Sequence, residues 1–151
     1  MAIVRPATEA DLPRILELYR EMTVTTSQAE AGRSPSPEDF RKVYAQICAM
    51  PGHDLLVAEE QGEVAGTMVL LIVPNLSHGA LPWATVENLV VDRRYQRQGL
   101  GKLLMEYAVT LAREAGCYKL QLSSNKKRSE AHHFYRDLGF QASAHGFRLY
   151  F

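Results

Sequence analysis

Hydrophobic side chains along the chain switch repeatedly between two spacings. They recur three and four positions apart at Leu12, Ile15 and Leu16, which is typical of a helix with one buried face. They form near-continuous runs through residues 64–73 and 84–91, which indicate buried strands. The expected elements are strands at 2–6, 55–60, 64–73, 84–91 and 119–123, helices at 8–22, 36–50, 99–115 and 129–138, and closing strands from Phe140 onward. This order, βααβββαβαββ, predicts an α+β fold with a mixed sheet and about four helices packed on it.

Local signals support several of these boundaries. Ser36 before Pro37 has the pattern of a capped helix start, and Gly116 is suited to a helix end. The polar stretches 23–36 and 74–82 contain few core formers, so we expect loops that contact a substrate. The first of these loops is a candidate mobile lid.

Length and composition narrow the class of protein. With 151 residues, we expect one domain spanning 1–151. Lys plus Arg and Asp plus Glu each number 17, so no overall charge attracts nucleic acid or an anionic membrane. Basic residues instead gather at 93–102 and 126–128, which favours a small anionic ligand. The sequence shows no signal peptide and no apolar run long enough to cross a bilayer, so we expect a cytoplasmic protein with no membrane partner.

The stretch 86–105 joins a buried strand, a basic turn, two glycines and the start of an amphipathic helix. A helix N-terminus carries unpaired N–H groups and the positive end of the helix dipole, which together bind phosphate. Gly99 and Gly101 leave room for a ligand close to the backbone, and four basic residues surround them: Arg93, Arg94, Arg97 and Lys102. We interpret the stretch as a cradle for a pyrophosphate-bearing cofactor. The alternative is a flexible turn with surface arginines.

Three motifs carry a resemblance to a known family. Gln96-x-x-Gly99-x-Gly101 is similar to the acetyl-CoA pyrophosphate motif of the GNAT superfamily of N-acetyltransferases. Residues 3–11 resemble the opening strand and helix of that family, and residues 131–140 resemble its last helix and the Gly-Phe turn after it. The resemblance therefore spans the whole chain in order.

This resemblance implies a mostly antiparallel central sheet in which strands 84–91 and 119–123 splay apart. Acetyl-CoA, the acyl donor, would lie between them, with its pantetheine on strand backbone and its pyrophosphate on amides at the helix start. The implied cofactor contacts are Leu89, Val90, Val91, Gln96, Arg97, Gln98, Gly99, Leu100, Gly101, Lys102, Asn125, Arg128 and His132.

One position departs from the family pattern. Family members commonly have an asparagine three residues before the alanine of the last helix, and here Arg128 stands three residues before Ala131. Either Asn125 does that work from a longer loop, or Arg128 makes the cofactor contact.

Two residues are candidate catalytic groups. Glu87 is an acid within an apolar strand, which we expect to be buried beside the thioester, and similar enzymes use a glutamate there as a base. Tyr135 matches the family position of a general acid toward the coenzyme A thiolate. The structural alternatives are a carboxylate paired with a neighbour and a core tyrosine with its hydroxyl at the rim.

The acceptor is indicated only by class. Residues 125–135 resemble the aminoalkylphosphonate N-acetyltransferases, and residues 116–119 resemble the glucosamine-6-phosphate N-acetyltransferases. Both groups modify small amines that carry an anionic group, so we expect direct transfer to a small primary amine in a ternary complex. A protein N-terminus or lysine remains an alternative acceptor, and a non-catalytic acyl-CoA-binding regulatory domain is a third reading.

The remaining expectations concern metal ions and the oligomeric state. His132 and His133 are adjacent in a helix and point about 100° apart, so we expect no metal. Similar proteins are often dimers, which sets the expectation of a homodimer.

Overall fold

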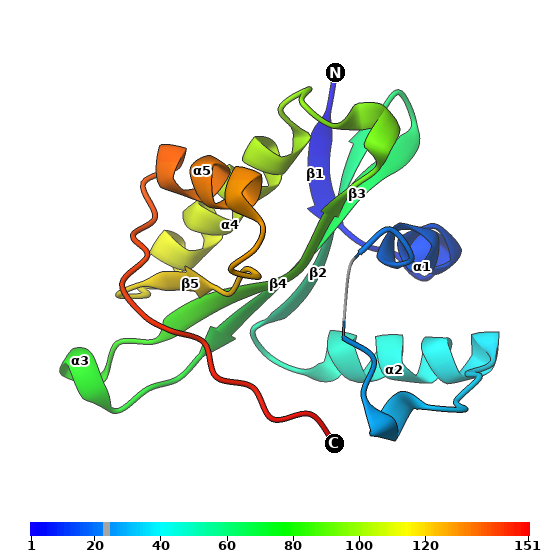
Figure 1. The fold of residues 1–151 in the computed structure, drawn as a ribbon, viewed down its shortest axis with the longest axis horizontal. Helices are drawn as coiled ribbons and strands as arrows, with labels where there is room; N and C mark the ends of the chain where they lie inside the picture. Colours follow the sequence, from blue (N-terminus) through cyan, green and yellow to red (C-terminus); the bar gives the residue numbers. More distant parts are fainter. Residues whose placement is uncertain (23–24) are drawn as a thin grey trace.

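The computed structural model describes residues 1–22 and 25–151, so part of the predicted loop 23–36 lies outside the described residues (Figure 1). The strands are β1 (Ile3–Pro6), β2 (His53–Glu60), β3 (Glu63–Val73), β4 (Trp83–Val91) and β5 (Leu120–Leu122). The helices are α1 (Leu12–Tyr19), α2 (Pro37–Ala49), α3 (Ser77–Ala80), α4 (Leu100–Glu114) and α5 (Ser129–Asp137). Three short 3₁₀ turns, η1 (Glu9–Asp11), η2 (Gln28–Glu30) and η3 (Arg93–Tyr95), complete the elements.

The strands form one sheet in the order β1-β2-β3-β4-β5. Neighbouring strands are antiparallel except β4 and β5, which are parallel. One apolar cluster joins the sheet to α4 and α5, and a second joins its other face to α1 and α2 (Figure 1). The α+β fold with a mixed, mostly antiparallel sheet is therefore confirmed.

The ends of the helices follow from capping side chains. Ser36 caps α2, because its hydroxyl accepts a hydrogen bond from the Asp39 N–H at 3.2 Å. Asp11 accepts from the Thr8 N–H at 2.7 Å and also binds the Arg5 guanidinium at 2.8 Å, which ties β1 to the start of α1. Gly116 ends α4 with a left-handed φ of 78°.

A bulge divides β4 and changes the direction of its side chains. Ala84 and Val86 pack on the α4 side of the sheet, and so do Leu89 and Val91, although strict alternation would send the second pair to the other face. The pairing with β3 shifts between Glu87 and Val90, and Asn88 has a φ of 54°. The extra residue therefore places both Glu87 and Asn88 off the α4 face.

The closing strands predicted from Phe140 onward are not formed. Residues 138–151 contain no helix or strand, and Phe147 and Leu149 are exposed (Figure 1). The segment is held at its end, where the Ala29 N–H donates to the Phe151 carbonyl at 2.7 Å. The last strand of the sheet, β5, is only three residues long and offers few backbone groups for pairing with this segment.

The predicted loop 74–82 contains the short helix α3, and its backbone turns sharply at His78 and Gly79, both with positive φ. Across the described ranges, no helix has the length and apolar character needed to cross a bilayer.

Candidate active site

The parallel strands β4 and β5 separate halfway along β4. They pair only from Ala84 to Val86, opposite Leu120 to Leu122, and β5 then ends. Glu87, Val90 and Val91 of β4 still pair with β3 on their other side. One edge of β4 is therefore left without a strand partner over five residues, as the family resemblance implied.

The open edge carries backbone groups from alternate residues. The Asp92 N–H points to β3, where it donates to the Ala65 carbonyl at 2.8 Å, so the peptide groups of Val91 and Leu89 point to the open edge. The Gln96 side chain lies along this edge and donates to the Val91 carbonyl at 3.2 Å. Gln96 thus contacts the strand backbone in this structure, and Leu89 presents its peptide group to the opening.

The N-terminus of α4 follows the open edge directly. Gly99 is its cap residue, with a φ of 84°, and its carbonyl accepts the first helical hydrogen bond from Leu103 at 2.9 Å. The N–H groups of Leu100, Gly101 and Lys102 therefore have no partner within the helix. A Cβ at Gly99 would meet no described atom within 4 Å, so open space surrounds this residue.

Gly101 has a different environment. A Cβ there would lie 3.4 Å from Cζ of Phe134 on α5 and 3.9 Å from a methyl group of Val91. The missing side chain at Gly101 therefore lets α4 lie close to α5 and β4, in addition to leaving its N–H accessible.

The basic residues of the turn divide into two groups. Arg94 folds back onto the protein, where it binds Asp92 at 3.0 Å and Glu63 at 2.6 Å. Arg93 and Arg97 are exposed and have no ion-pair partner in the described part of the chain, while Lys102 lies 3.7 Å from Glu106. Gln98 braces the turn by donating to the Arg94 carbonyl at 3.1 Å.

Glu87 lies at the bulge, and the expectation that it is buried is wrong. Its side chain is exposed, because β5 ends opposite Val86 and the bulge turns residues 87 and 88 outward. No described residue forms an ion pair with it. Burial raises the pKa of the Tyr19 hydroxyl at the end of α1, and the nearby Asn88 side chain lowers it, so α1 reaches the same point of β4.

Tyr135 is half-buried on α5, with its ring edge-on to Phe140 at a centroid distance of 6.1 Å. Burial raises the pKa of its hydroxyl above the ordinary value, and the positive charge of Arg128 opposes this shift. The hydroxyl therefore keeps its proton at neutral pH, as a proton donor must.

Asn125, Arg128 and His132 lie together at the start of α5. The Asn125 side chain accepts from the Lys127 N–H at 2.9 Å, and the backbone carbonyl oxygen of Asn125 lies 2.9 Å from Nε2 of His132. Asn125 thus shapes the turn before α5, whereas the Arg128 side chain forms no ion pair with a described residue. Tyr135 lies one helical turn beyond His132.

Three contributors were not identified from the sequence. Asn88 and Tyr19 form the contact at the bulge, and the hydroxyl of Ser124, two residues beyond β5, is buried without a hydrogen-bond partner among the described residues. The bulge has a sequence signal, because two consecutive polar residues, Glu87 and Asn88, interrupt the apolar positions of the strand. The Tyr19 contact and Ser124 have no such signal.

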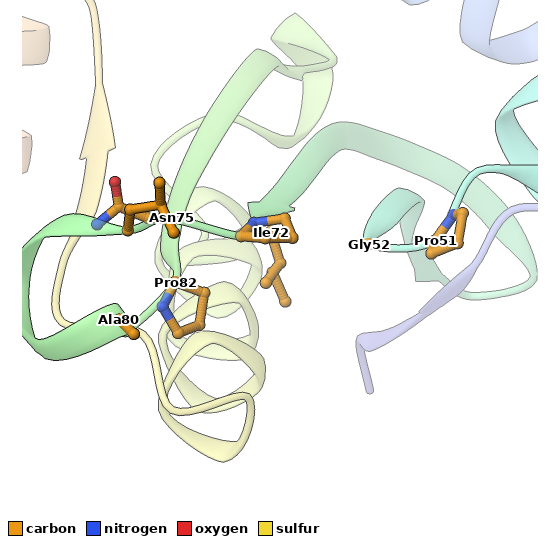
Figure 2. A pocket seen from close by; sticks show the side chains of 8 residues that line it. Pro51, Gly52, Ile72, Asn75, Ala80 and Pro82 are labelled. Carbon is orange, nitrogen blue, oxygen red and sulfur yellow. The ribbon is translucent and has the colours of Figure 1, made fainter.

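Two shallow cavities lie outside this site. The larger, of about 550 Å³, lies between the turn before β2 and the connection from β3 to β4 (Figure 2). Figure 2 shows Ile72 and Pro82 pointing into this mainly apolar hollow. The second, of about 400 Å³, lies between α4 and α5 and includes Lys102 at its rim. The described residues contain no group of three side chains suited to hold a metal ion.

The chain is similar to members of one protein family. The model of the Acetyltransferase (GNAT) family matches residues 12–140. Glucosamine 6-phosphate N-acetyltransferase of Trypanosoma brucei brucei is 36% identical over 146 residues, covering 97% of this chain and 93% of the relative. Aminoalkylphosphonate N-acetyltransferase of Salmonella typhimurium is 30% identical over 141 residues, covering 93% and 85%. The solved structure of a transcriptional regulator from Bacillus halodurans C-125 has a TM-score of 0.89 at 27% identity and covers 100% of both chains.

Proposed function

Because this chain belongs to the GNAT acetyltransferase family, we propose that it moves an acetyl group from acetyl-CoA to the primary amine of a small anionic molecule. The observation that carries the proposal is the opening between β4 and β5, which leads directly to the free N–H groups of α4. An extended ligand with a phosphate group at one end fits this arrangement. We further propose a cytoplasmic location and a homodimer.

We assign the cofactor contacts by the chemistry of the open edge. The pantetheine amides would bond to the peptide groups of Leu89 and Val91, and the pyrophosphate would accept hydrogen bonds from the amides of residues 98–102. Arg93 and Arg97 supply positive charge near that point, and neither forms an ion pair with a described residue. The unpartnered Ser124 hydroxyl fits a ligand between the strands, because buried polar groups normally have a partner.

At the start of α5, we assign the cofactor contact to Arg128. The Asn125 side chain is already bonded within its own turn, so it has less capacity for a ligand. Arg128 is exposed and forms no ion pair with a described residue.

The reaction needs a base and an acid. Glu87, directly or through a water molecule, takes a proton from the ammonium group of the acceptor. The freed amine attacks the thioester carbonyl, so a C–N bond forms; when the tetrahedral intermediate collapses, the C–S bond breaks and the nitrogen releases its second proton to solvent, as Glu87 releases the first. Tyr135 donates its proton to the leaving sulfur and recovers one from solvent. The products are the acetylated amine and coenzyme A.

The anionic group of the acceptor is supported by two observations. Two relatives are named for the N-acetylation of glucosamine 6-phosphate and aminoalkylphosphonates. This chain also has basic residues at 126–128, and the charge of one of them, Arg128, acts on the proposed acid Tyr135. We propose a phosphorylated amino sugar or an aminophosphonate as the acceptor.

Release of coenzyme A thiol tests the proposal. The full chain is assayed with acetyl-CoA and four amines: glucosamine 6-phosphate, 2-aminoethylphosphonate, and two counterparts that lack the anionic group, glucosamine and ethanolamine. We expect kcat/KM to be at least about tenfold higher for one phosphorylated amine than for its counterpart, because a charge-assisted hydrogen bond is worth about 1.5–3 kcal/mol. Equal rates within both pairs would contradict the anionic acceptor. Binding of acetyl-CoA without thiol release to any small amine would favour a protein acceptor or a regulatory domain.

A further inference from the structure

The turn between β4 and α4 begins at a buried carboxylate. The side chain of Asp92 is only 5% exposed, and it contacts the guanidinium groups of Arg14 on α1 and Arg94 in η3. Its Oδ1 also accepts the Arg94 N–H at 2.8 Å, which caps η3. Asp92 therefore holds both the backbone and a side chain of the turn.

The same network continues onto the start of β3. Arg14 donates through Nε to the Val64 carbonyl at 3.0 Å. The Glu63 carboxylate accepts from Arg94 at 2.6 Å and from the Tyr95 hydroxyl at 3.1 Å. Three segments that are distant in the sequence, α1, the start of β3 and the turn, are thus fixed to one another by charge.

The turn needs such support because its backbone adopts left-handed conformations. Arg97 has a φ of 62° and Gly99 a φ of 84°, and a non-glycine residue at positive φ costs about 1–2 kcal/mol. Arg97 directly precedes the amides of residues 98–102 that we assign to the pyrophosphate, and Gly99 lies among them. A small change in the backbone of the turn would therefore move those amides away from the pyrophosphate that they would bind together.

The charges of the network are also directed away from the ligand. The Arg94 guanidinium is bound by two carboxylates, Glu63 and Asp92. The neighbouring Arg93 and Arg97 are therefore the arginines that would pair with the phosphate groups. The role of Arg94 is then to shape the turn.

We propose that Asp92 is a positioning residue for the acyl donor: together with Arg14 and Glu63 it holds the turn in the shape that presents the amides of residues 98–102 to the pyrophosphate. This inference rests on the proposed acetyl-CoA site. If the network only stabilised the fold, its loss would weaken the binding of every ligand alike. If the network positions the turn, its loss weakens only the binding of the phosphate-bearing part of the ligand.

The test compares two ligands that differ in that part. Acetyl-CoA and S-acetyl-pantetheine, which lacks the phosphates and the nucleoside, are titrated by calorimetry into the full chain and into Asp92→Asn. We expect the Kd of acetyl-CoA to rise about tenfold, because a buried hydrogen-bond network loses its charged acceptor, while the Kd of S-acetyl-pantetheine changes less than about twofold. Glu17→Gln is the matched control, because Glu17 is an exposed carboxylate bound to the same Arg14 at 3.0 Å. It should leave both Kd values unchanged.

Each result decides between the readings. Equal loss for both ligands, or no loss in folded Asp92→Asn, overturns the positioning role while the proposed function stands. If wild-type protein binds no acetyl-CoA, the proposed function and this inference both fail. If Asp92→Asn does not fold, Glu63→Gln decides by the same comparison, because Glu63 is 42% exposed and contacts the turn from its solvent side. We then expect a loss of about threefold for acetyl-CoA alone, since a partly exposed pair contributes less.

Discussion

Glu87 occupies an exposed position on a bulged strand, which suits a group that exchanges protons with solvent and an entering amine. If it is the base, Glu87→Gln lowers kcat/KM by about 100-fold at neutral pH, and the deficit shrinks as the pH approaches the pKa of the acceptor amine. The reason is that an amine that is already neutral needs no base. The pH profile of thiol release measures this effect. A constant deficit at every pH would contradict the assignment.

Tyr135 combines a half-buried ring with a hydroxyl whose pKa is raised by burial. Tyr135→Phe should lower kcat by about 10- to 100-fold through the loss of the proton donor, and it should leave the Kd of acetyl-CoA within about twofold. Steady-state kinetics and calorimetry separate the two effects. Tyr150→Phe, on the exposed C-terminal segment, is the matched control and should change neither. Unchanged kcat in Tyr135→Phe would return this residue to a packing role.

Individual residues differ in how far their sequence context predicts them. The sequence motif identifies Gly99, and the structure adds its left-handed backbone and the open space around it. The contacts of Arg94 could not be predicted, because its partner Glu63 is 31 residues away in the chain. Composition counts the charge of an arginine but does not reveal the direction in which its side chain folds.

The packing of α4 against α5 gives a prediction at the level of elements. Gly101→Val should weaken acetyl-CoA binding by about tenfold or more, because a branched side chain would press on the Phe134 ring, which already lies 3.4 Å from the position of a Cβ. Calorimetry of the folded variant measures the loss. Gly146→Val is a matched change in the C-terminal segment, where a Cβ would meet one atom at 4.0 Å, and it should have no effect. Wild-type affinity in Gly101→Val would contradict the cradle.

The link between β1 and α1 predicts a pH dependence of stability. The hydrogen bond from Arg5 lowers the pKa of Asp11 below its ordinary value, and burial opposes this shift. A carboxylate whose pKa is lowered by folding stabilises the protein fully above its unfolded pKa of about 3.9, and the stabilisation is lost as the pH falls through the folded pKa. Protonation of Asp11 below pH 4 should therefore loosen the start of α1.

Asp11→Asn tests this dependence. We expect it to lower the free energy of unfolding at pH 7 by about 1–3 kcal/mol and to flatten the decline of Tm between about pH 5 and pH 3. Thermal unfolding across this range measures both quantities. Asp39→Asn, at the corresponding capping position of α2 but exposed, is the control and should change Tm less. An identical pH profile for Asp11→Asn and the wild type would contradict the argument.

Elements with local signals were predicted well, and those that depend on distant partners were not. Ser36, Pro37 and Gly116 mark helix ends through capping and backbone preference, which act within a few residues. The closing strands from Phe140 failed for the opposite reason. Their apolar pattern is suited to a strand, but a strand also needs a paired edge, and β5 is too short to supply one.

At the level of the whole molecule, the site results from the arrangement of the sheet. The splay of β4 from β5, the bulge at Asn88 and the start of α4 meet at one end of the sheet. α1 contacts this region twice, through Arg14 at the turn and through Tyr19 at the bulge. The motif for the proposed phosphate end is readable from the sequence. The support from α1 is visible only in three dimensions, because it joins residues 78 positions apart.

The central claim is that the opening beside α4 binds acetyl-CoA, and one calorimetric titration of the full chain tests it directly. We expect one-to-one binding with a Kd in the micromolar range, weaker at higher salt because phosphate charge contributes to it. Dephospho-coenzyme A, which retains the pyrophosphate, should also bind. Absence of binding heat for both ligands in folded protein would contradict the account, and the two glycines would then serve only the turn.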